Sequence, residues 1–460
     1  MKTISYADAY TRTVESFADD FPIIRAFVDD LPAGPVLEVG AGAGRTLKMG
    51  LNRELYLVEK DPEMLTILSS RIRDAKYQNG TPHKREIIDS EAANTPLPSN
   101  SMAGVFLSIN TLAEALPILF TMSEIHRVLM PNGRVLIINE NPQVWEKLRT
   151  NGLCYSADTE YTYFLRTLPV AGNGPFSFLT EFDVRKNKES RVFSIRQELL
   201  THSAMTSLLE ATGFNVVRTL GSFVGEEFNS DSSSIMIIEA EKLNSSLPVA
   251  FPFLQEKYDG FAADYDRIVE QAEYAVLPWL LDKTADFRGL SARVLDLGCG
   301  NGVIAASLVK QGIYGKFFGI DFSSGMLEAA RKRGIYSGLL QMDLSSGFPV
   351  VEHNYYDLVV ACGFFEFIID PRPTLKSIIS SLAQHGRAYL TFESRGDQSL
   401  PEGVHHSPSG LIKYYYTRDE LINVLTECGL KVVDLVEGDG YFSPSLKVRI
   451  PYLMATVMKA

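Results

Sequence analysis

The chain has 460 residues, of which 45% are hydrophobic and 22% charged, and its formal net charge at pH 7 is −12. This length and composition predict two or three globular domains with sizeable cores. The acidic balance argues against a general nucleic-acid binder, because such a protein needs a basic surface to neutralise phosphate.

The cysteines and the first residues indicate the cellular setting. Four cysteines show neither the spacing of a zinc site nor that of a disulfide framework, so we predict no metal ligand set; they are Cys154, Cys299, Cys362 and Cys428. Free thiols fit a reducing compartment. The start MKTISYADAY lacks the regions of a signal peptide, and no apolar run approaches the roughly 20 residues that span a bilayer. We therefore expect a cytoplasmic protein without a membrane partner.

One unusual pattern occurs twice along the chain. VLEVGAGAG covers residues 36–44 and VLDLGCGNG covers residues 294–302. Each is an apolar run with one carboxylate, followed by glycine at every second position. Further downstream, residues 208–217 and 424–433 both read as a helix, a glycine C-cap and a strand. This internal repeat predicts two copies of one fold.

The seam between the copies should lie in LNSSLPVAFP, which is rich in serine and proline. We therefore predict a first domain over residues 1–242, a linker over 243–252 and a second domain over 253–460. The first copy is longer than the second between corresponding strands, so an insertion is expected near residues 154–193. Alternation and aromatic residues in that segment indicate strands or a lid.

Short, continuously apolar runs recur in both copies. Residues 133–139 and 357–363 are examples, and such runs are typical of parallel strands that are buried on both faces. They alternate with helical patterns along the chain. We therefore expect an α/β fold with two doubly wound, Rossmann-like domains, each a mostly parallel sheet flanked by helices.

A glycine turn follows the first strand of each copy and lets the backbone approach a ligand closely. The glycines are Gly40, Gly42 and Gly44 in the first copy and Gly298, Gly300 and Gly302 in the second. A dinucleotide-binding turn would read G-x-G-x-x-G, whereas Arg45 and Val303 occupy the place of its third glycine. The acids Glu38 and Asp296 precede the turns; a carboxylate there would repel phosphate but suit a cationic amine.

Both patterns resemble motif I of the class I S-adenosylmethionine-dependent methyltransferases, and the resemblance covers nearly the whole chain, twice over. It implies S-adenosylmethionine as the cofactor, held by the glycine turns together with Glu38 and Asp296. In that family the acid that ends the second strand binds the ribose hydroxyls, and by position this is Glu59 or Asp321. A carboxylate accepts two hydroxyl hydrogen bonds at once. The competing interpretation is an acid that caps a helix.

The same resemblance places another acid after the third strand, near the adenine amino group. This is Asp343 in the second copy and Asp89 in the first, where Glu91 is the alternative. A turn acid that satisfies its own backbone is the competing interpretation. Aromatic segments before each first strand, residues 4–17 and 256–266, resemble the family's lid over cofactor and substrate, although they equally fit the packing of an amphipathic helix.

Methyl transfer from a sulfonium needs alignment of the nucleophile and exclusion of water, with a base where the acceptor must lose a proton. In the family, substrate-facing residues follow the fourth strand and lie in a variable late segment. The second copy offers Glu366 and the adjacent His405 and His406 as catalytic candidates. The alternatives are a solvated helix start and two exposed loop histidines. In the first copy, Asn110 and Glu114 could face the substrate.

The first copy departs further from the family pattern. It has Gly104 where Asp357 begins the fourth strand of the second copy, and Glu59 where aspartate is commoner. The leading hypothesis is methyl transfer to nitrogen or oxygen atoms of a small-molecule acceptor, in two successive methylations. The alternative is that only the second copy catalyses and the first is a binding or scaffolding module. The missing G-x-G-x-x-G disfavours a nucleotide-dependent oxidoreductase, and the acidic charge disfavours nucleic acid as a partner.

Overall fold

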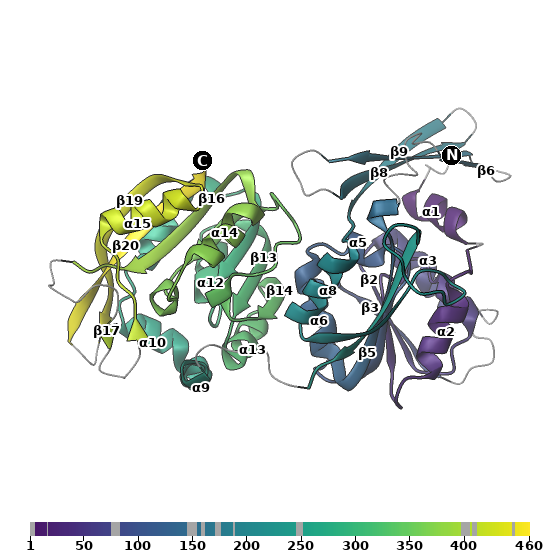
Figure 1. Ribbon diagram of the computed structural model, residues 1–460, viewed down its shortest axis with the longest axis horizontal. Coiled ribbons are helices and arrows are strands. Elements are labelled where there is room, and N and C mark those ends of the chain that lie inside the picture. The colour runs from purple at the N-terminus through teal and green to yellow at the C-terminus, as the bar shows by residue number, and fades with distance from the viewer. Residues whose placement is uncertain are drawn as a thin grey trace. The chain divides into compact units, whose positions relative to one another are not determined.

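The computed structural model describes residues 5–15, 17–74, 83–144, 154–157, 162–170, 176–186, 189–244, 252–396, 405–406, 412–443 and 447–460. The chain separates into two units, Met1–Ser246 and Leu247–Ala460. Each unit has its own sheets (Figure 1). Each also has its own hydrophobic core. Among the described helices, none is both long and apolar enough to cross a membrane.

A seven-stranded sheet in the order β10-β11-β5-β4-β1-β2-β3 forms the centre of the first unit. β1 to β5 are parallel, whereas β11 runs antiparallel to both of its neighbours. The strands are β1 (Val36–Val39), β2 (Leu55–Glu59), β3 (Arg85–Asp89), β4 (Met102–Leu107), β5 (Leu129–Glu140), β10 (Phe214–Leu220) and β11 (Ile235–Lys242). Every residue of β1 and β4 is buried, because helices cover both faces of such a sheet.

Helices flank this sheet, each with an apolar side turned to the core. They are α1 (Tyr6–Val14), α2 (Phe21–Asp29), α3 (Pro62–Arg73), α5 (Thr111–Glu114), α6 (Ile118–Val128) and α8 (His202–Ala211), with the 3-10 helix η1 (Arg45–Met49) after β1. The sequence of α2 has proline in its first turn and places Ile24, Phe27 and Val28 at helical spacing. These three side chains are buried in the core of the unit.

The second unit repeats this connectivity in a sheet of order β14-β13-β12-β15-β16-β20-β19. β12 to β16 are parallel and β20 is antiparallel to its neighbours. The strands are β12 (Ser291–Leu297), β13 (Tyr314–Asp321), β14 (Tyr336–Gln341), β15 (Tyr356–Ala361), β16 (Leu382–Glu393), β19 (Leu430–Ser443) and β20 (Val448–Lys459). The two doubly wound, mostly parallel sheets that the sequence predicted are confirmed.

The helices of the second unit position the segments between these strands. They are α9 (Pro252–Phe261), α10 (Tyr265–Gln271), α11 (Val276–Lys283), α12 (Val303–Lys310), α13 (Ser324–Lys332), α14 (Arg372–Ser381) and α15 (Arg418–Glu427), with 3-10 helices η2 (Ala262–Asp264), η3 (Ala285–Phe287), η4 (Leu344–Ser346) and η5 (Phe365–Phe367). In both sheets the strand order reverses beside the first strand, between β1 and β4 and between β12 and β15. Ligands of doubly wound sheets bind at this point, outside the carboxyl ends of the strands.

The first unit also contains a four-stranded sheet, which has no four-stranded counterpart among the described residues of the second unit. Four antiparallel strands, in the order β6-β7-β8-β9, follow one another along the chain. They are β6 (Cys154–Ala157), β7 (Thr162–Pro169), β8 (Ser177–Lys186) and β9 (Glu189–Glu198). Val184 of β8 packs on Ala9 of α1, and Phe178 of β8 packs on Ala113 of α5. The inserted sheet therefore lies against α1 and α5, which are both close to the carboxyl ends of the central strands (Figure 1).

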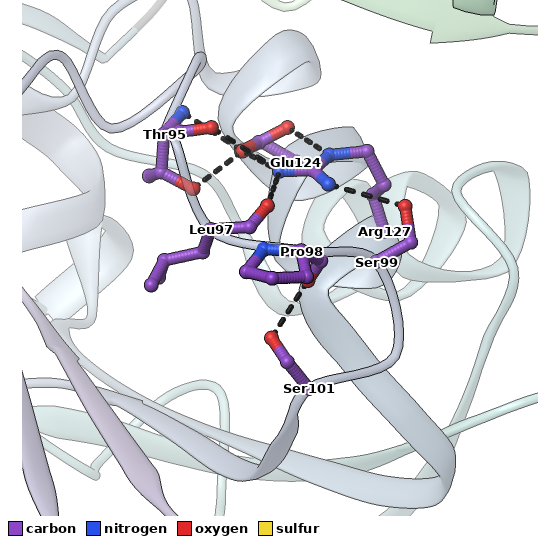
Figure 2. A network of polar contacts seen from close by, with 7 residues as sticks. All are labelled: Thr95, Leu97, Pro98, Ser99, Ser101, Glu124 and Arg127. Carbon is purple, nitrogen blue, oxygen red and sulfur yellow. Dashed lines mark hydrogen bonds and ion pairs between the residues drawn. The ribbon is translucent and has the colours of Figure 1, made fainter.

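A buried polar network fixes the loop between β3 and β4 (Figure 2). The carboxylate of Glu124 on α6 accepts hydrogen bonds from the backbone N–H and the hydroxyl of Thr95, at 2.8 and 2.6 Å. Arg127 forms an ion pair with the same carboxylate at 2.6 Å and donates to the carbonyl of Leu97 at 2.7 Å. The loop that begins just after β3 is thus attached firmly to α6.

Candidate active site

The two glycine turns have matching backbone conformations. The φ angles are +67°, +54° and +80° in the first unit and +66°, +53° and +85° in the second, for Gly40, Gly42, Gly44, Gly298, Gly300 and Gly302. All six angles lie in the left-handed region, which side chains with a Cβ rarely adopt. The repeated sequence therefore specifies a repeated three-dimensional turn.

The glycines of each turn serve different purposes. A Cβ on Gly298 would lie 2.9 Å from the ring of Phe364, and a Cβ on Gly40 would collide with Thr111, so these first glycines allow close packing. A Cβ on Gly42 would meet no described atom within 4 Å, and one on Gly300 would lie 3.5 Å from Tyr265. Gly42 therefore faces open space, whereas Gly300 faces the ring of Tyr265 at van der Waals distance, with no closer atom among the described residues.

A carboxylate from the end of the second strand holds the central glycine in each unit. The N–H of Gly42 donates to Oε2 of Glu59 at 2.8 Å, and the N–H of Gly300 donates to Oδ2 of Asp321 at 2.8 Å. The other oxygen of Asp321 accepts the N–H of Ser323 at 2.9 Å. Both predicted ribose-binding acids are thus fixed beside the glycine turn, with lone pairs left to accept further hydrogen bonds.

The surroundings of the two acids differ in burial. Asp321 is 5% exposed, and burial raises its pKa to about 6, although backbone N–H groups that stabilise the charged form oppose the shift. Glu59 is only half-buried. The second unit therefore places its acid in the drier environment, where a hydrogen bond to a ligand is stronger.

The strand register bears on the acids after the third strand. In the first unit Asp89 is the register partner of Glu59. In the second, the partner of the strand-ending acid is Gln341, two positions before Asp343. The register therefore makes Glu91, the alternative in the first copy, the positional counterpart of Asp343.

The environments of these acids agree with that assignment. Asp343 lines a cavity, and it also accepts the N–H of Ser345 at 2.8 Å as a cap of η4. Asp89 is exposed, while Glu91 forms an ion pair with Lys60 at 2.9 Å. An adenine contact by Asp343 or Asp89 remains a prediction.

The acids that precede the glycines lie inside the cores. Glu38 and Asp296 are each 1% exposed. The hydroxyl of Thr46 donates to Glu38, and that of Tyr336 donates to Asp296 at 2.7 Å. Burial raises the pKa of Glu38 to about 8 and that of Asp296 to about 7. Asp296 is not among the residues that line the cavity, and it lies in the core beneath the turn. A contact of Glu38 or Asp296 with a cationic amine stays a prediction.

The cavity of the second unit has a volume of about 550 Å³. Gly298, Gly300 and Asp321 form one part of its wall, and Glu366 forms another. Much of the remaining wall is aromatic, with Tyr258, Tyr265, Tyr274, Phe364, Tyr441 and Tyr452. The glycine turn, the ribose-position acid and the predicted catalytic glutamate therefore share one cavity.

The aromatic segment before β12 covers this cavity. Tyr258 of α9 lies against Phe322 and Tyr265, with ring centroids 5.8 and 6.3 Å apart. The carboxylate of Asp259 accepts hydrogen bonds from the hydroxyl of Ser323 at 2.6 Å and from the N–H of Gly325 at 2.7 Å. These bonds attach the lid to the start of α13, directly after Asp321.

The first unit closes its turn in another way. The ring centroids of Tyr6 and Tyr10 of α1 lie 5.5 Å apart. Both rings contact Phe182 of the inserted sheet, at centroid distances of 6.4 and 6.0 Å. Glu63 of α3 accepts a hydrogen bond from the hydroxyl of Ser5 at 2.5 Å. The N-terminal aromatic residues are thus packed between the turn and the insertion.

Glu366, one of the predicted catalytic residues, is buried in the wall of the cavity. It is 3% exposed, and its Oε1 accepts the hydroxyl of Tyr452 at 2.7 Å. Burial raises its pKa, as does the nearby Glu393, while Lys413 acts in the opposite direction. The predicted alternative of a solvated helix start is wrong, because the carboxyl is buried within the cavity wall.

The other catalytic candidates are His405 and His406. Their backbones form β17 (His405–His406), which pairs with β18 (Ile412–Lys413) in an antiparallel ladder. Their side chains lie outside the described residues. A catalytic role for either histidine stays a prediction.

The corresponding candidates of the first unit have protein partners. Asn110 donates to Glu140 at 2.9 Å and accepts the N–H of the same residue. Gln197 of the inserted sheet donates to Glu114 at 2.9 Å, and burial raises the pKa of Glu114 to about 7. The insertion therefore reaches the segment that follows the fourth strand, where an acceptor is expected.

Gly104, which replaces the family's acid at the start of the fourth strand, has a structural role. A Cβ there would collide with Leu31, so glycine allows α2 and the loop after it to approach the sheet. Asp357, at the equivalent place in the second unit, forms an ion pair with Arg293 at 2.8 Å on β12. Neither arrangement touches the glycine turn, so this difference does not bear on the binding of a ligand there.

Comparison with known proteins agrees with this geometry. A family model described as "Methyltransferase domain" matches the chain twice, over residues 37–137 and 295–390. The ubiquinone biosynthesis O-methyltransferase of Aeromonas salmonicida (strain A449) is 25% identical over 176 residues, which are 35% of this chain and 70% of that protein. That of Xanthomonas axonopodis pv. citri (strain 306) is 25% identical over 207 residues, 40% of this chain and 83% of its own.

Among solved structures, an S-adenosylmethionine-dependent methyltransferase from Clostridium acetobutylicum ATCC 824 aligns with a TM-score of 0.43 at 13% identity, over 52% of this chain and 98% of its own. The CcbJ methyltransferase from Streptomyces caelestis aligns with a TM-score of 0.42 at 18% identity, over 49% and 90%. Both halves of this chain are S-adenosylmethionine-dependent methyltransferase domains. The tandem methyltransferase predicted from the repeated glycine pattern is thereby confirmed.

The residues of both methyltransferase domains fit S-adenosylmethionine. In each, a glycine of the turn stands beside a carboxylate that accepts that glycine's own N–H. Gly42 and Glu59 form this cradle in the first domain, and Gly300 and Asp321 form it in the second. A carboxylate so fixed can accept hydroxyl groups of a ribose without reorganising.

Sequence reasoning missed two residues of the second domain's site. Glu393 ends β16 and is fully buried, and Lys413 of β18 forms an ion pair with it. Both line the cavity. The available signal was an acid at the end of a buried apolar run, the same signal that identified Asp321. Lys413 carried no signal, because only the fold brings it to the strand ends.

Proposed function

We propose that this tandem methyltransferase transfers methyl groups to nitrogen or oxygen atoms of a small-molecule acceptor, and that the second domain performs at least one transfer. The observation that supports this is the shared cavity, which joins the cofactor residues Gly300 and Asp321 to Glu366. An aromatic cavity of about 550 Å³ suits a metabolite rather than a macromolecule.

The chain's residues divide the work. Asp321 and the turn around Gly300 hold and orient the cofactor, which when bound supplies an electrophilic methyl group. Tyr258 and Tyr265 of the lid keep water from the cavity. Glu366 takes the proton of an acceptor that must lose one, because burial raises the pKa of its carboxyl to about 7 and so makes its carboxylate form a stronger base.

The first domain is proposed to bind S-adenosylmethionine as well, since its turn has the same backbone angles and the same hydrogen bond from Gly42 to Glu59. Two working domains would carry out two successive methylations. A second candidate is that the first domain binds without catalysing. That alternative is supported by Asn110 and Glu114, whose polar atoms already bond to Glu140 and Gln197.

Titration of the intact chain with S-adenosylhomocysteine tests the cofactor part of the proposal. We expect two sites in the wild-type protein and one in each of Gly42→Arg and Gly300→Arg, because an arginine would fill the open space of the turn. Gly225→Arg and Gly289→Arg are matched controls, since both glycines have positive φ angles and open surroundings away from the turns. Binding of two equivalents by both turn variants would reject the proposed sites.

Transfer of an isotopic methyl group from S-adenosylmethionine into a metabolite extract tests the chemistry. Loss of all transfer in Gly300→Arg alone would assign catalysis to the second domain. Partial loss in each variant, with different labelled products, would support successive methylations. Full activity in both variants would overturn the proposal.

A further inference from the structure

The cavity wall beyond Glu366 contains a second buried carboxylate. Glu366 follows β15, and Glu393 ends the adjacent strand β16, so that both lie at the carboxyl ends of neighbouring strands. The N–H of Tyr414 donates to the carbonyl of Glu366 at 2.8 Å, which brings β18 and its Lys413 to the same place. Glu366, Glu393 and Lys413 all line the cavity and are here called the acceptor cluster.

The hydrogen bonds of the acceptor cluster are incomplete. Oε1 of Glu366 accepts from Tyr452 at 2.7 Å, and Oε1 of Glu393 accepts from Lys413 and, at 3.2 Å, from Tyr441. Within the part of the chain that the structure describes, Oε2 of both glutamates has no hydrogen-bond partner. Glu366 is 3% exposed and Glu393 is fully buried. Buried carboxylate oxygens without partners are costly, so a ligand that donates hydrogen bonds is expected beside them.

The charge of the acceptor cluster favours positively charged ligands over negatively charged ones. It contains two carboxyl groups and one ammonium group, and the ammonium group of Lys413 is already engaged by Glu393 and by the hydroxyl of Tyr441 at 3.0 Å. A cation entering the cavity would meet an excess of negative charge, whereas an anion would be repelled. Aromatic rings around the cluster favour a cation further, as the position of Lys413 over the rings of Phe367 and Tyr441 illustrates, at 5.3 and 5.4 Å.

We propose, on the basis of the methyl-transfer function above, that the acceptor cluster binds a primary or secondary amine in its ammonium form. Glu366 and Glu393 each accept one N–H of the ammonium group, while Lys413 offsets part of the negative charge of the two glutamates. A hydroxyl group offers one hydrogen and could satisfy only one of the two glutamates.

The proton balance is simple in this arrangement. One N–H proton of the bound ammonium passes to the carboxylate of Glu366, which becomes a neutral carboxylic acid and leaves a neutral amine with a free lone pair. Burial, which raises the pKa of Glu366, favours this transfer. The titratable groups that face Glu366 include Glu393, Lys413, Tyr452 and Tyr441, and on the other packed elements Tyr258, Tyr265, Tyr274 and Cys362.

Three probes of similar size test the charge preference: 2-phenylethylamine, 2-phenylethanol and phenylacetate. Each is titrated into the intact Gly42→Arg protein, with S-adenosylhomocysteine saturating the second domain. We expect the amine to bind at least tenfold more tightly than the alcohol, and phenylacetate not to bind. Glu393→Gln should weaken the amine at least tenfold while leaving the affinity for S-adenosylhomocysteine unchanged within twofold. Glu427→Gln, an exposed glutamate paired with Arg372, is the matched control.

Lys413→Met distinguishes a site that binds an ammonium group from a site that binds a carboxylate. If the cluster binds an ammonium group, removing Lys413 increases the negative charge and the amine binds as tightly or more tightly. If Lys413 instead binds a carboxylate, phenylacetate binds the parent protein and loses affinity in the variant, which would overturn the inference. Absence of amine binding, or an unchanged preference in Glu393→Gln, would also overturn it. Failure of S-adenosylhomocysteine itself to bind the second domain would reject the proposed function instead.

Discussion

The two halves of this chain hold their glycine turns in the same way and close over them in different ways. In both halves the backbone nitrogen of the central glycine lies 2.8 Å from a carboxylate oxygen of its acidic partner. In the second half, Tyr258 and Tyr265 from the helices before the sheet cover the turn. In the first half, Tyr6 of α1 packs with Ala43 of the turn, and the inserted sheet packs on α1. The cofactor side of the fold is therefore common to both halves, whereas the acceptor side is particular to each.

The fifth strands of the two sheets end in the same residue type but place it in different surroundings. β5 and β16 both end in glutamate, Glu140 and Glu393. Asn110 bonds to Glu140 through two hydrogen bonds at 2.9 Å, while Glu393 pairs with Lys413 and keeps one oxygen without a described partner. A neutral amide and an ammonium group impose different charges on equivalent acids. We infer that the two halves do not recognise the same acceptor group.

The acid that joins the N-terminal aromatic segment to the next helix lies on opposite partners in the two halves. In the second half, Asp259 of the lid accepts from the start of α13. In the first half, Glu63 of the helix accepts from Ser5 of the lid. The same joint between lid and helix has thus been built from an acid on either side.

The largest expected effect concerns the loops after the third strands. Glu124→Ala should lower the free energy of unfolding of the first domain by about 3 kcal/mol, because it leaves the buried guanidinium of Arg127 and the N–H of Thr95 without their acceptor. Calorimetry should show the corresponding transition about 6–12 °C lower. In the second domain, Ser377 bonds to Phe348 at the equivalent loop, and Ser377→Ala should cost only about 1 kcal/mol. Equal effects would contradict this ranking.

The next effect compares the acids of the two turns. Asp321→Asn and Glu59→Gln should each weaken the binding of S-adenosylhomocysteine to their own domain by roughly 10–100-fold, or about 1.4–2.7 kcal/mol. We expect the larger loss in Asp321→Asn, because Asp321 is more deeply buried. Calorimetric titration measures both, with the exposed Asp370→Asn as the control. Unchanged affinity in both variants would exclude these acids from the cofactor site.

A smaller effect depends on pH. Glu38 has a folded-state pKa of about 8, above its ordinary value, so the stability it contributes is present below pH 4.5 and is lost as the pH rises through about 8. Glu38→Gln keeps the neutral shape. It should therefore raise the melting temperature of the first domain at pH 9, by about 2–6 °C for roughly 1–2 kcal/mol, and change it little at pH 5. A shift of the same size at both pH values would show that charge is not the cause.

The smallest effect concerns the lid joints. Asp259→Asn and Glu63→Gln should each weaken S-adenosylhomocysteine binding about threefold, or by about 0.7 kcal/mol, because a neutral acceptor forms a weaker hydrogen bond to the joint. Faster dissociation should account for the loss, as stopped-flow measurements can show. If association slows instead, the lid does not act by retaining the ligand.

The glycine turns and their acids could be predicted because each depends on local sequence. Alternating glycines permit the left-handed angles, and an acid that ends a buried strand emerges beside the turn whatever the rest of the fold does. The acid after the third strand was harder to assign. Asp89 and Glu91 are only two positions apart, and the strand register, which makes Glu91 the counterpart of Asp343, cannot be read from spacing alone.

The sequence by itself determined that the chain repeats one doubly wound methyltransferase fold and where each copy places its cofactor turn. These features follow from short-range patterns of apolar residues, glycines and acids. Only the tertiary structure decided that Lys413 meets Glu393 and that the inserted sheet covers α1, because long-range packing brings together segments far apart in the chain. It also decided that Glu366 is buried rather than solvated, since burial depends on every element packed around a residue.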